Sequence, residues 1–176
     1  MPHSNALAHE VAIYSPESLQ RLASVLWNSR EEPPTLSVLL YVVLGAFAGL
    51  RPAEAVALEW KHIDWARREI HLEAPIVKLA RTVPIKDNLL AFLLPHKGRN
   101  GLVVIHKKVA NLLRNQCAQA GVAHISNGLR RSYASYRLGE VPEEIVQKEM
   151  GLDSSNRPDW KTVPAAEVAK YWAVRP

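Results

Sequence analysis

The chain has 176 residues, of which 48% are hydrophobic and 22% are charged, which is the composition of an ordinary globular protein. Its 22 Lys and Arg against 17 Asp and Glu give a formal net charge of +5, which permits a polyanionic partner without requiring one. The single cysteine, Cys117, excludes an intramolecular disulfide and suits a reducing compartment, so we expect a cytoplasmic protein. The seven histidines lack ligand spacing and no glycine-rich phosphate loop is present, so we predict neither a metal nor a small-molecule cofactor.

The first part of the chain predicts three helices. Ser15-Pro16-Glu17 is typical of a helix start, with a capping hydroxyl, a proline in the first turn and an early acid. The uncharged run Leu36–Leu50 is shorter than the roughly 20 residues that cross a bilayer, so it predicts a buried helix and no membrane contact. Gly49 ends that helix and Pro52 opens the next, for which the predicted apolar face consists of Ala53, Val56, Ala57 and Trp60.

From Ile63 onward the hydrophobic pattern changes to that of short strands. Three β-branched segments separated by turn-like residues predict a small antiparallel sheet, at residues 70–73, 76–78 and 82–85. Lys78 is expected at or beside the second turn of this sheet. Helical patterns resume at Leu89–Leu94, Lys107–Ala118, Leu129–Leu138, Glu143–Met150 and Ala165–Trp172. We therefore predict a mainly α fold with one small three-stranded antiparallel β-sheet, an α+β arrangement.

No repeat, low-complexity tract or linker divides the sequence. Residues 1–176 are therefore predicted to form one domain, in which residues 1–14 are a flexible N-terminal segment. Two histidines and Glu10 interrupt the first ten residues, which do not resemble a signal peptide.

Two arginines and a lysine stand at positions suited to binding a phosphate. Arg51 and Arg130 each lie at the entrance of a predicted helix, and Lys78 lies between them in the strand region. Two planar guanidiniums and an ammonium on separate elements can contact one phosphate from several sides. The residues alone leave a second interpretation open, in which Arg51 pairs with Glu54 or Glu59 and the other two are ordinary solvated side chains.

Several segments resemble the motifs of the tyrosine recombinase (phage integrase) family, in that family's order. Gly49–Trp60, with Ile63-Asp64 just beyond, looks like its first arginine box. Lys78 followed by Arg81–Ile85 looks like its β-hairpin lysine, with a spacing about two residues tighter than usual.

The second half of the chain continues this resemblance. Asn127–Tyr136 looks like the second arginine box, and Glu149–Gly151 resembles the lead-in to the third. Ala169–Trp172 resembles the terminal helix of a bacterial integrase subgroup. The similarity extends from about Ile13 to the C-terminus and implies the fold of the family's catalytic domain.

The resemblance implies a domain that cleaves and rejoins DNA through a covalent 3′-phosphotyrosine. In that chemistry two arginines hold the scissile phosphate, a lysine protonates the departing 5′-oxygen, and a tyrosine attacks. Arg51 and Arg130 match the two arginines, and Lys78 matches the lysine. Together with Arg131 they are the predicted DNA-binding residues, and duplex DNA is the predicted partner.

Other positions depart from the family pattern. Asn127 stands where a histidine or lysine is usual, a change that the resembling subgroup shares, and Leu152 replaces the third-box histidine. The segment that carries the nucleophile is shortened, so either Asp159 or Trp160 falls where the tyrosine belongs. Neither side chain forms a phosphotyrosine.

The remaining tyrosines near the motifs are expected to be structural. Tyr133 and Tyr136 share the predicted helix of Arg130 and are interpreted as core residues, and Tyr171 as an anchor of the last helix. The leading hypothesis is a degenerate, cleavage-defective integrase domain that binds DNA, a mobile-element remnant without the family's N-terminal core-binding domain. Two alternatives stay open: an active strand transferase that uses an unrecognised tyrosine or one from a recombinase partner subunit, and an interaction module without DNA affinity.

Overall fold

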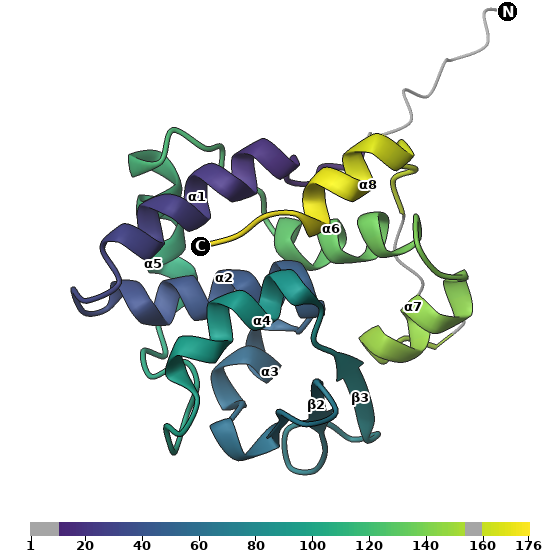
Figure 1. The fold of residues 1–176 in the computed structure, drawn as a ribbon, viewed down its shortest axis with the longest axis horizontal. Helices are drawn as coiled ribbons and strands as arrows, with labels where there is room; N and C mark the ends of the chain where they lie inside the picture. Colours follow the sequence, from purple (N-terminus) through teal and green to yellow (C-terminus); the bar gives the residue numbers. More distant parts are fainter. Residues whose placement is uncertain (1–10, 154–159) are drawn as a thin grey trace, which may run out of the picture.

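The computed structural model describes residues 11–153 and 160–176. Helix α2 (Thr35–Ala48) runs through the middle of the molecule, and the other elements surround it (Figure 1). The helices that contact α2 are α1 (Pro16–Asn28), α3 (Pro52–Ala57), α4 (Asp87–Leu93), α5 (Val109–Gln119) and α6 (Gly128–Arg137). Helix α7 (Glu143–Met150) packs against strand β3, and α8 (Ala165–Trp172) lies on α1 and α6.

The uncharged sequence of α2 explains its central position. Every residue of this helix except Leu36 is buried, so it presents apolar surface in all directions and must be surrounded by other helices. The helix ends at Gly49, which has a left-handed backbone with φ of 63°. A Cβ atom at Gly49 would lie 2.4 Å from Cδ1 of Tyr133, so both the conformation and the close approach of α6 require glycine here.

Helix α1 begins as the sequence predicts. Ser15 is the N-cap, its Oγ accepts a hydrogen bond from the backbone N–H of Ser18 at 3.1 Å, and Pro16 is the first helical residue. The buried residues of α1 recur at helical spacing and face α2; they are Leu19, Leu22, Ala23 and Leu26.

A three-stranded antiparallel sheet follows α3 and a 3-10 turn, η1 (Trp60–His62). Its strands are β1 (Ile63–Asp64), β2 (Glu69–Leu72) and β3 (Arg81–Pro84), in the order β1-β2-β3. Ile70 of β2 pairs with Ile63 on one side and Val83 on the other. The three-stranded sheet was predicted, but the strand predicted at residues 76–78 is wrong. These residues belong to the connection between β2 and β3, and the remaining strand of the sheet is β1, which precedes β2 in the chain.

The later helices lie where the sequence predicts them. The predicted bounds of α7 and α8 are those observed, and the bounds of α4, α5 and α6 differ by one or two residues at each end. A second 3-10 turn, η2 (Leu94–His96), follows α4. The predicted face of α3 is wrong in part, because α3 ends before Trp60, Ala53 is exposed, and the buried residues are Glu54 and Ala55. A carboxylate therefore occupies the inner face of this helix.

The described chain is already ordered on the core before α1. Tyr14 is 1% exposed, and its backbone N–H donates to Oγ of Ser132 at 2.8 Å. Tyr14, the last residue of the segment predicted to be flexible (residues 1–14), is therefore packed on the core, and residues 1–10 lie outside the described residues. Near the other end, Arg175 and Gln20 exchange hydrogen bonds across α1. Within the described residues, no helix has the length and apolarity needed to cross a membrane.

Candidate functional site

Arg51 lies at the junction between α2 and α3, where the chain turns after Gly49. It is the N-cap of α3, and Pro52 takes the first helical position. The carboxylate of Glu54 accepts the backbone N–H of Arg51 at 2.7 Å and its Nη1 at 2.9 Å, which fixes the base of the side chain. The side chain of Arg51 is nevertheless 42% exposed. The guanidinium is held on one side and open on the other.

Arg130 lies in the first turn of α6 and points toward the same junction. Its Nη1 donates to the carbonyl of Gly49, and its Nη2 donates to the carbonyl of Met150 at 2.7 Å. Nη2 of Arg51 donates to the next carbonyl, that of Gly151, at 3.0 Å. Two consecutive carbonyls at the end of α7 thus accept from the two arginines, so the guanidiniums converge.

The charge state of Arg130 reflects this crowding. Burial, together with the nearby positive charges of Arg51 and Arg81, lowers its pKa to about 10, against the opposing charge of Glu54. Arg130 therefore remains protonated at neutral pH, but its charge is poorly solvated. An anion bound beside Arg130 would compensate its lost solvation and offset the repulsion from Arg51 and Arg81.

Arg81 of β3 is a third guanidinium in this cluster. Its side chain is 6% exposed; Nη2 donates to Glu54 at 2.7 Å, and Nε donates to the carbonyl of Glu149 at 2.8 Å. Burial alone would raise the pKa of Glu54, but hydrogen bonds from Arg81 and Arg51 outweigh it and the pKa is lowered. One carboxylate thus faces three guanidiniums, those of Arg51, Arg81 and Arg130.

A second buried ion pair fixes the end of α7. Glu149 accepts two hydrogen bonds from Arg137, at 2.8 and 3.0 Å, and one from the hydroxyl of Tyr133 at 2.7 Å. The helix then ends at Gly151, which has a left-handed backbone with φ of 60°. A Cβ atom at this position would lie 3.0 Å from Nη1 of Arg81. The carbonyls that receive Arg51 and Arg130 are therefore held rigidly.

The arginine pair opens into a groove of about 810 Å³. Arg51, Arg130 and Arg131 all line it. Among the described residues, no hydrogen bond or ion pair is formed by the side chain of Arg131, which is half-buried. Three of the four predicted DNA-binding residues therefore lie in one groove.

Three of the positions at which the sequence departs from the family pattern also line this groove: Asn127, Leu152 and Trp160. Asn127 precedes α6 with a left-handed backbone, φ of 54°, and its side chain caps no helical N–H. Leu152 and Trp160 are half-buried and pack on the core. The indole N–H of Trp160 is buried and has no acceptor in the described part of the chain. Asp159 lies outside the described residues.

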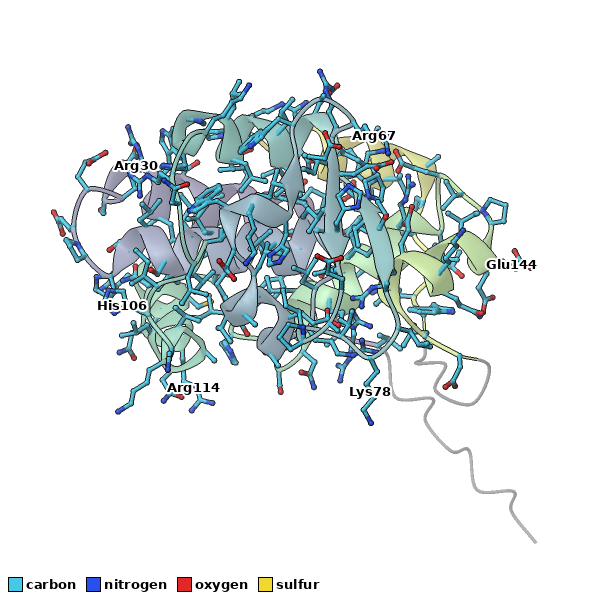
Figure 2. The ribbon with its side chains drawn as sticks, turned by 90° about the horizontal axis from the view of Figure 1, so that it is seen from below. Arg30, Arg67, Lys78, His106, Arg114 and Glu144 are labelled. Atoms are coloured by element: carbon cyan, nitrogen blue, oxygen red, sulfur yellow. The ribbon has the colours of Figure 1, made fainter. Side chains whose placement is uncertain are left out.

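Lys78 is the one predicted cation that does not line the groove. It is exposed in the connection between β2 and β3. Figure 2 shows Lys78 projecting from the same edge of the molecule as Arg114, a residue of α5 that lines the groove. Arg67 lies on the opposite side. Lys78 therefore lies outside the groove, in the connection between β2 and β3, and does not meet the two arginines.

All five tyrosines belong to the described residues, and all are buried. The hydroxyl of Tyr136 donates to the carbonyl of Tyr14 at 3.2 Å, and that of Tyr171 donates to the carbonyl of Ala46. The predictions that Tyr133 and Tyr136 are core residues and that Tyr171 anchors α8 are confirmed. Tyr41 alone among the five lines the groove, and burial raises its pKa. A raised pKa makes a phenol a poorer nucleophile at neutral pH.

Comparison with known proteins gives no match to a family model and none to a curated protein. Solved structures do match. XerA recombinase superimposes with a TM-score of 0.68 at 15% identity, over 94% of this chain and 60% of that one. The chain has the fold of a tyrosine recombinase catalytic domain. The integrase of mycobacterium phage Brujita gives 0.64 at 18% identity, over 92% of this chain and 63% of that one.

The catalytic domain of bacteriophage HP1 integrase also gives a TM-score of 0.64, at 20% identity, over 95% of this chain and 90% of that domain. The chain spans only about three fifths of XerA recombinase and of the Brujita integrase, but nearly all of the HP1 catalytic domain. The predicted mainly α fold with a small antiparallel sheet, and its resemblance to the tyrosine recombinase catalytic domain, are confirmed.

Sequence reasoning missed two contributors to the site. Arg81 was noted only as part of the hairpin motif, although it contacts Glu54, 27 positions away in sequence. Glu54 was considered only as a competitor for Arg51, whereas it holds Arg51 and Arg81 together. A signal was present, because a glutamate three residues after an N-cap commonly bonds back to that residue. Glu59, the other candidate partner, pairs with Lys61 instead.

Proposed function

We propose that this protein is a DNA-binding domain of the recombination and integration class that grips phosphate with Arg51 and Arg130 but does not cleave. The observation that carries the proposal is the convergence of these two guanidiniums on the end of α7 at the rim of one groove. The likeness to the fold of tyrosine recombinase catalytic domains supports the assignment to the recombination and integration class.

The local charge supports an anionic ligand. Arg51 and Arg81 both pair with Glu54, whose charge also acts on Arg130, and Arg131 adds a further positive charge at the groove. Phosphate oxygens accept hydrogen bonds from guanidiniums in a planar, often bidentate geometry. The backbone of duplex DNA presents such groups at regular intervals, so it is the proposed partner.

The apolar part of the groove lining supports the proposal that the protein does not cleave DNA. Leu152 and Trp160 bring apolar surface to the place where the family resemblance expects a histidine and a tyrosine. Tyr133, Tyr136 and Tyr171 are buried and bonded elsewhere. A mobile-element origin and a cytoplasmic location belong to the same proposal, the latter because the lone Cys117 is buried as a free thiol.

The test is duplex binding as a function of salt. Affinity is expected to be weak, independent of sequence, and to fall with salt along a slope of roughly −0.9 per phosphate contact on logarithmic axes. Replacing both arginines, Arg51→Ala with Arg130→Ala, should lower the affinity at least tenfold and flatten the slope by about two contacts. Fluorescence anisotropy with a labelled duplex measures both quantities.

The control removes two exposed arginines away from the groove, Arg67→Ala with Arg99→Ala, so that net charge changes equally. Thermal unfolding of each variant identifies the temperature at which all are folded. Equal losses of affinity in the two double variants would mean that only net charge matters. An absence of duplex binding at low salt would favour the alternative of an interaction module without DNA affinity.

A further inference from the structure

The groove is longer than a phosphate-binding site requires. Beyond the arginines it continues between α2, α5 and the start of α6 into a largely apolar part, which we call the α5 chamber. Its lining residues are Tyr41, Gly45, Leu113, Ile125 and Leu129. The whole groove has the volume of a small-molecule site, for which roughly 300–1,000 Å³ is usual.

The α5 chamber contains a hydroxyl that lacks a partner. Tyr41 is only 7% exposed, and within the described residues its hydroxyl forms no hydrogen bond. The hydroxyl is not among the fully buried side-chain atoms that lack a hydrogen-bond partner, so it reaches the open groove and is available to bond to a ligand. A purely apolar occupant would leave it unsatisfied.

The rim of the α5 chamber is also polar. Asn111 and Arg114 lie on the exposed side of α5, and His124 and Asn127 lie in the segment before α6. Amide and imidazole groups offer donors and acceptors that match the edge of a nucleobase, while apolar walls suit its faces. An acyl chain would use none of these polar groups.

The spacing along α2 relates the α5 chamber to the arginine pair. Tyr41 precedes Gly49 by eight residues, which is about 12 Å along a helix axis. The carbonyl of Gly49 accepts from Arg130, and Tyr41 lines the same groove, so the two ends of the groove are about two turns of α2 apart. A phosphate and its own base could therefore occupy both ends of the groove.

We propose that the α5 chamber receives an unpaired base of the DNA strand whose phosphate lies on Arg51 and Arg130. This inference rests on the proposed function, because it uses the same phosphate site. In a paired duplex the bases are stacked and present only their groove edges, so a whole base cannot enter the chamber and the chamber selects DNA in which one base is free to leave the stack.

The experiment compares two duplexes that differ at one position, where 2-aminopurine is either paired or left extrahelical. The protein should bind the extrahelical duplex on the order of tenfold more tightly, with a change in 2-aminopurine fluorescence. Ala110→Trp, on an exposed position of α5 that lines the groove, should fill the chamber and reduce this ratio to about one. Ala118→Trp, also exposed on α5 but outside the groove, should preserve the ratio.

Because the readout is the ratio between two duplexes in the same variant, it is independent of contacts common to both. A wild-type ratio near one, or a ratio that survives Ala110→Trp, overturns the inference while paired-duplex binding still supports the proposed function. Free 2-aminopurine nucleotide binding without any duplex binding overturns both, since the ligand would then be a nucleotide rather than a strand. Tyr41→Phe, which removes only the hydroxyl, should lower the ratio by about threefold to tenfold.

Discussion

Two parts of the groove lining differ in how deeply they are built into the fold. In the first, which we call the arginine wall, Arg51 and Arg130 bond to carbonyls at the ends of α2 and α7, and the buried Glu54 and Arg81 tie α3 to β3. In the second, which we call the apolar wall, Leu152 and Trp160 contribute half-buried apolar surface. The polar contacts of the arginine wall hold secondary structure elements together, whereas the indole N–H of Trp160 has no acceptor among the described residues.

This difference explains how one wall can match the tyrosine recombinase pattern while the other departs from it. Removing an arginine that bonds two helix ends leaves carbonyls without donors and a carboxylate without its partner, which lowers stability. Replacing a surface tyrosine removes chemistry without that penalty. Part of the reason for arginine at these positions is therefore structural.

The largest expected effect concerns strand cleavage, which depends on the residues of the apolar wall. The isolated chain should form no covalent adduct on a nicked suicide duplex, because loss of a nucleophile typically costs on the order of 10⁴-fold or more in rate. Restoring Leu152→His with Trp160→Tyr should not recover full activity, since in-line attack requires close positioning that the shortened segment does not supply. A denaturing gel measures the adduct. A stable adduct that maps to Tyr133, Tyr136 or Tyr171 would contradict the account.

The next effect concerns stability of the arginine wall. Glu54→Gln breaks a buried ion pair and removes the carboxylate that pairs with Arg51 and Arg81, so the free energy of unfolding should fall by about 3–5 kcal/mol. The matched control is Glu144→Gln, exposed in the first turn of α7, with an expected loss below about 1 kcal/mol. Urea unfolding measures both. Similar losses in the two variants would show that the buried pair is not special.

The carboxylate of Glu54 also makes the stability of the folded protein depend on pH. Since the folded pKa of Glu54 is lowered from 4.5, its contribution to stability is present above pH 4.5 and is lost as the pH falls through the folded pKa. Urea unfolding between pH 7 and pH 3 should therefore show a steeper acid decline for the wild type than for Glu54→Gln. Parallel curves would exclude Glu54 as the source.

Anions should stabilise the folded protein through the arginine pair. At constant ionic strength, sulfate at ten times its Kd would add about 1.4 kcal/mol, which raises the Tm by a few degrees. Arg51→Ala should remove most of this gain, because its guanidinium is the more open of the pair, and Arg67→Ala should preserve it. An undiminished sulfate effect in Arg51→Ala would assign the anion to another surface.

The smallest effect is expected at Lys78. It is exposed and lies outside the groove, so Lys78→Ala should change duplex affinity by about threefold or less and the salt slope by at most one contact. The stability of the fold should not change. A loss as large as that of Arg51→Ala would mean that the hairpin closes onto bound DNA.

Much of the fold follows from local sequence signals. Ser15 and Pro16 mark the start of α1, and the bounds of α7 follow from Pro142 and Gly151, because capping and left-handed glycine act within a few residues. The failed strand at residues 76–78 had suitable β-branched residues, but pairing with a neighbouring strand decides whether such a segment joins a sheet.

The site was predictable only in part. Arg51 and Arg130 were found because each stands in a recognisable motif, and Lys78 was found but lies outside the groove. Arg81 acts on Glu54 through a tertiary contact, for which sequence spacing gives no signal. Tyr41 stands in a uniformly apolar helix, so nothing in the pattern distinguishes a groove-lining tyrosine from a core tyrosine.

The central claim is that Arg51 and Arg130 together hold one DNA phosphate. The most direct measurement is an NMR titration of the arginine Nε–H signals with a short duplex at low salt, with each signal assigned by single substitution. The account predicts that the signals of Arg51 and Arg130 shift together with the same saturation curve while that of Arg67 stays in place. Shifts of Arg67 equal to those of the pair, or no shift of the pair at saturating duplex, would contradict it.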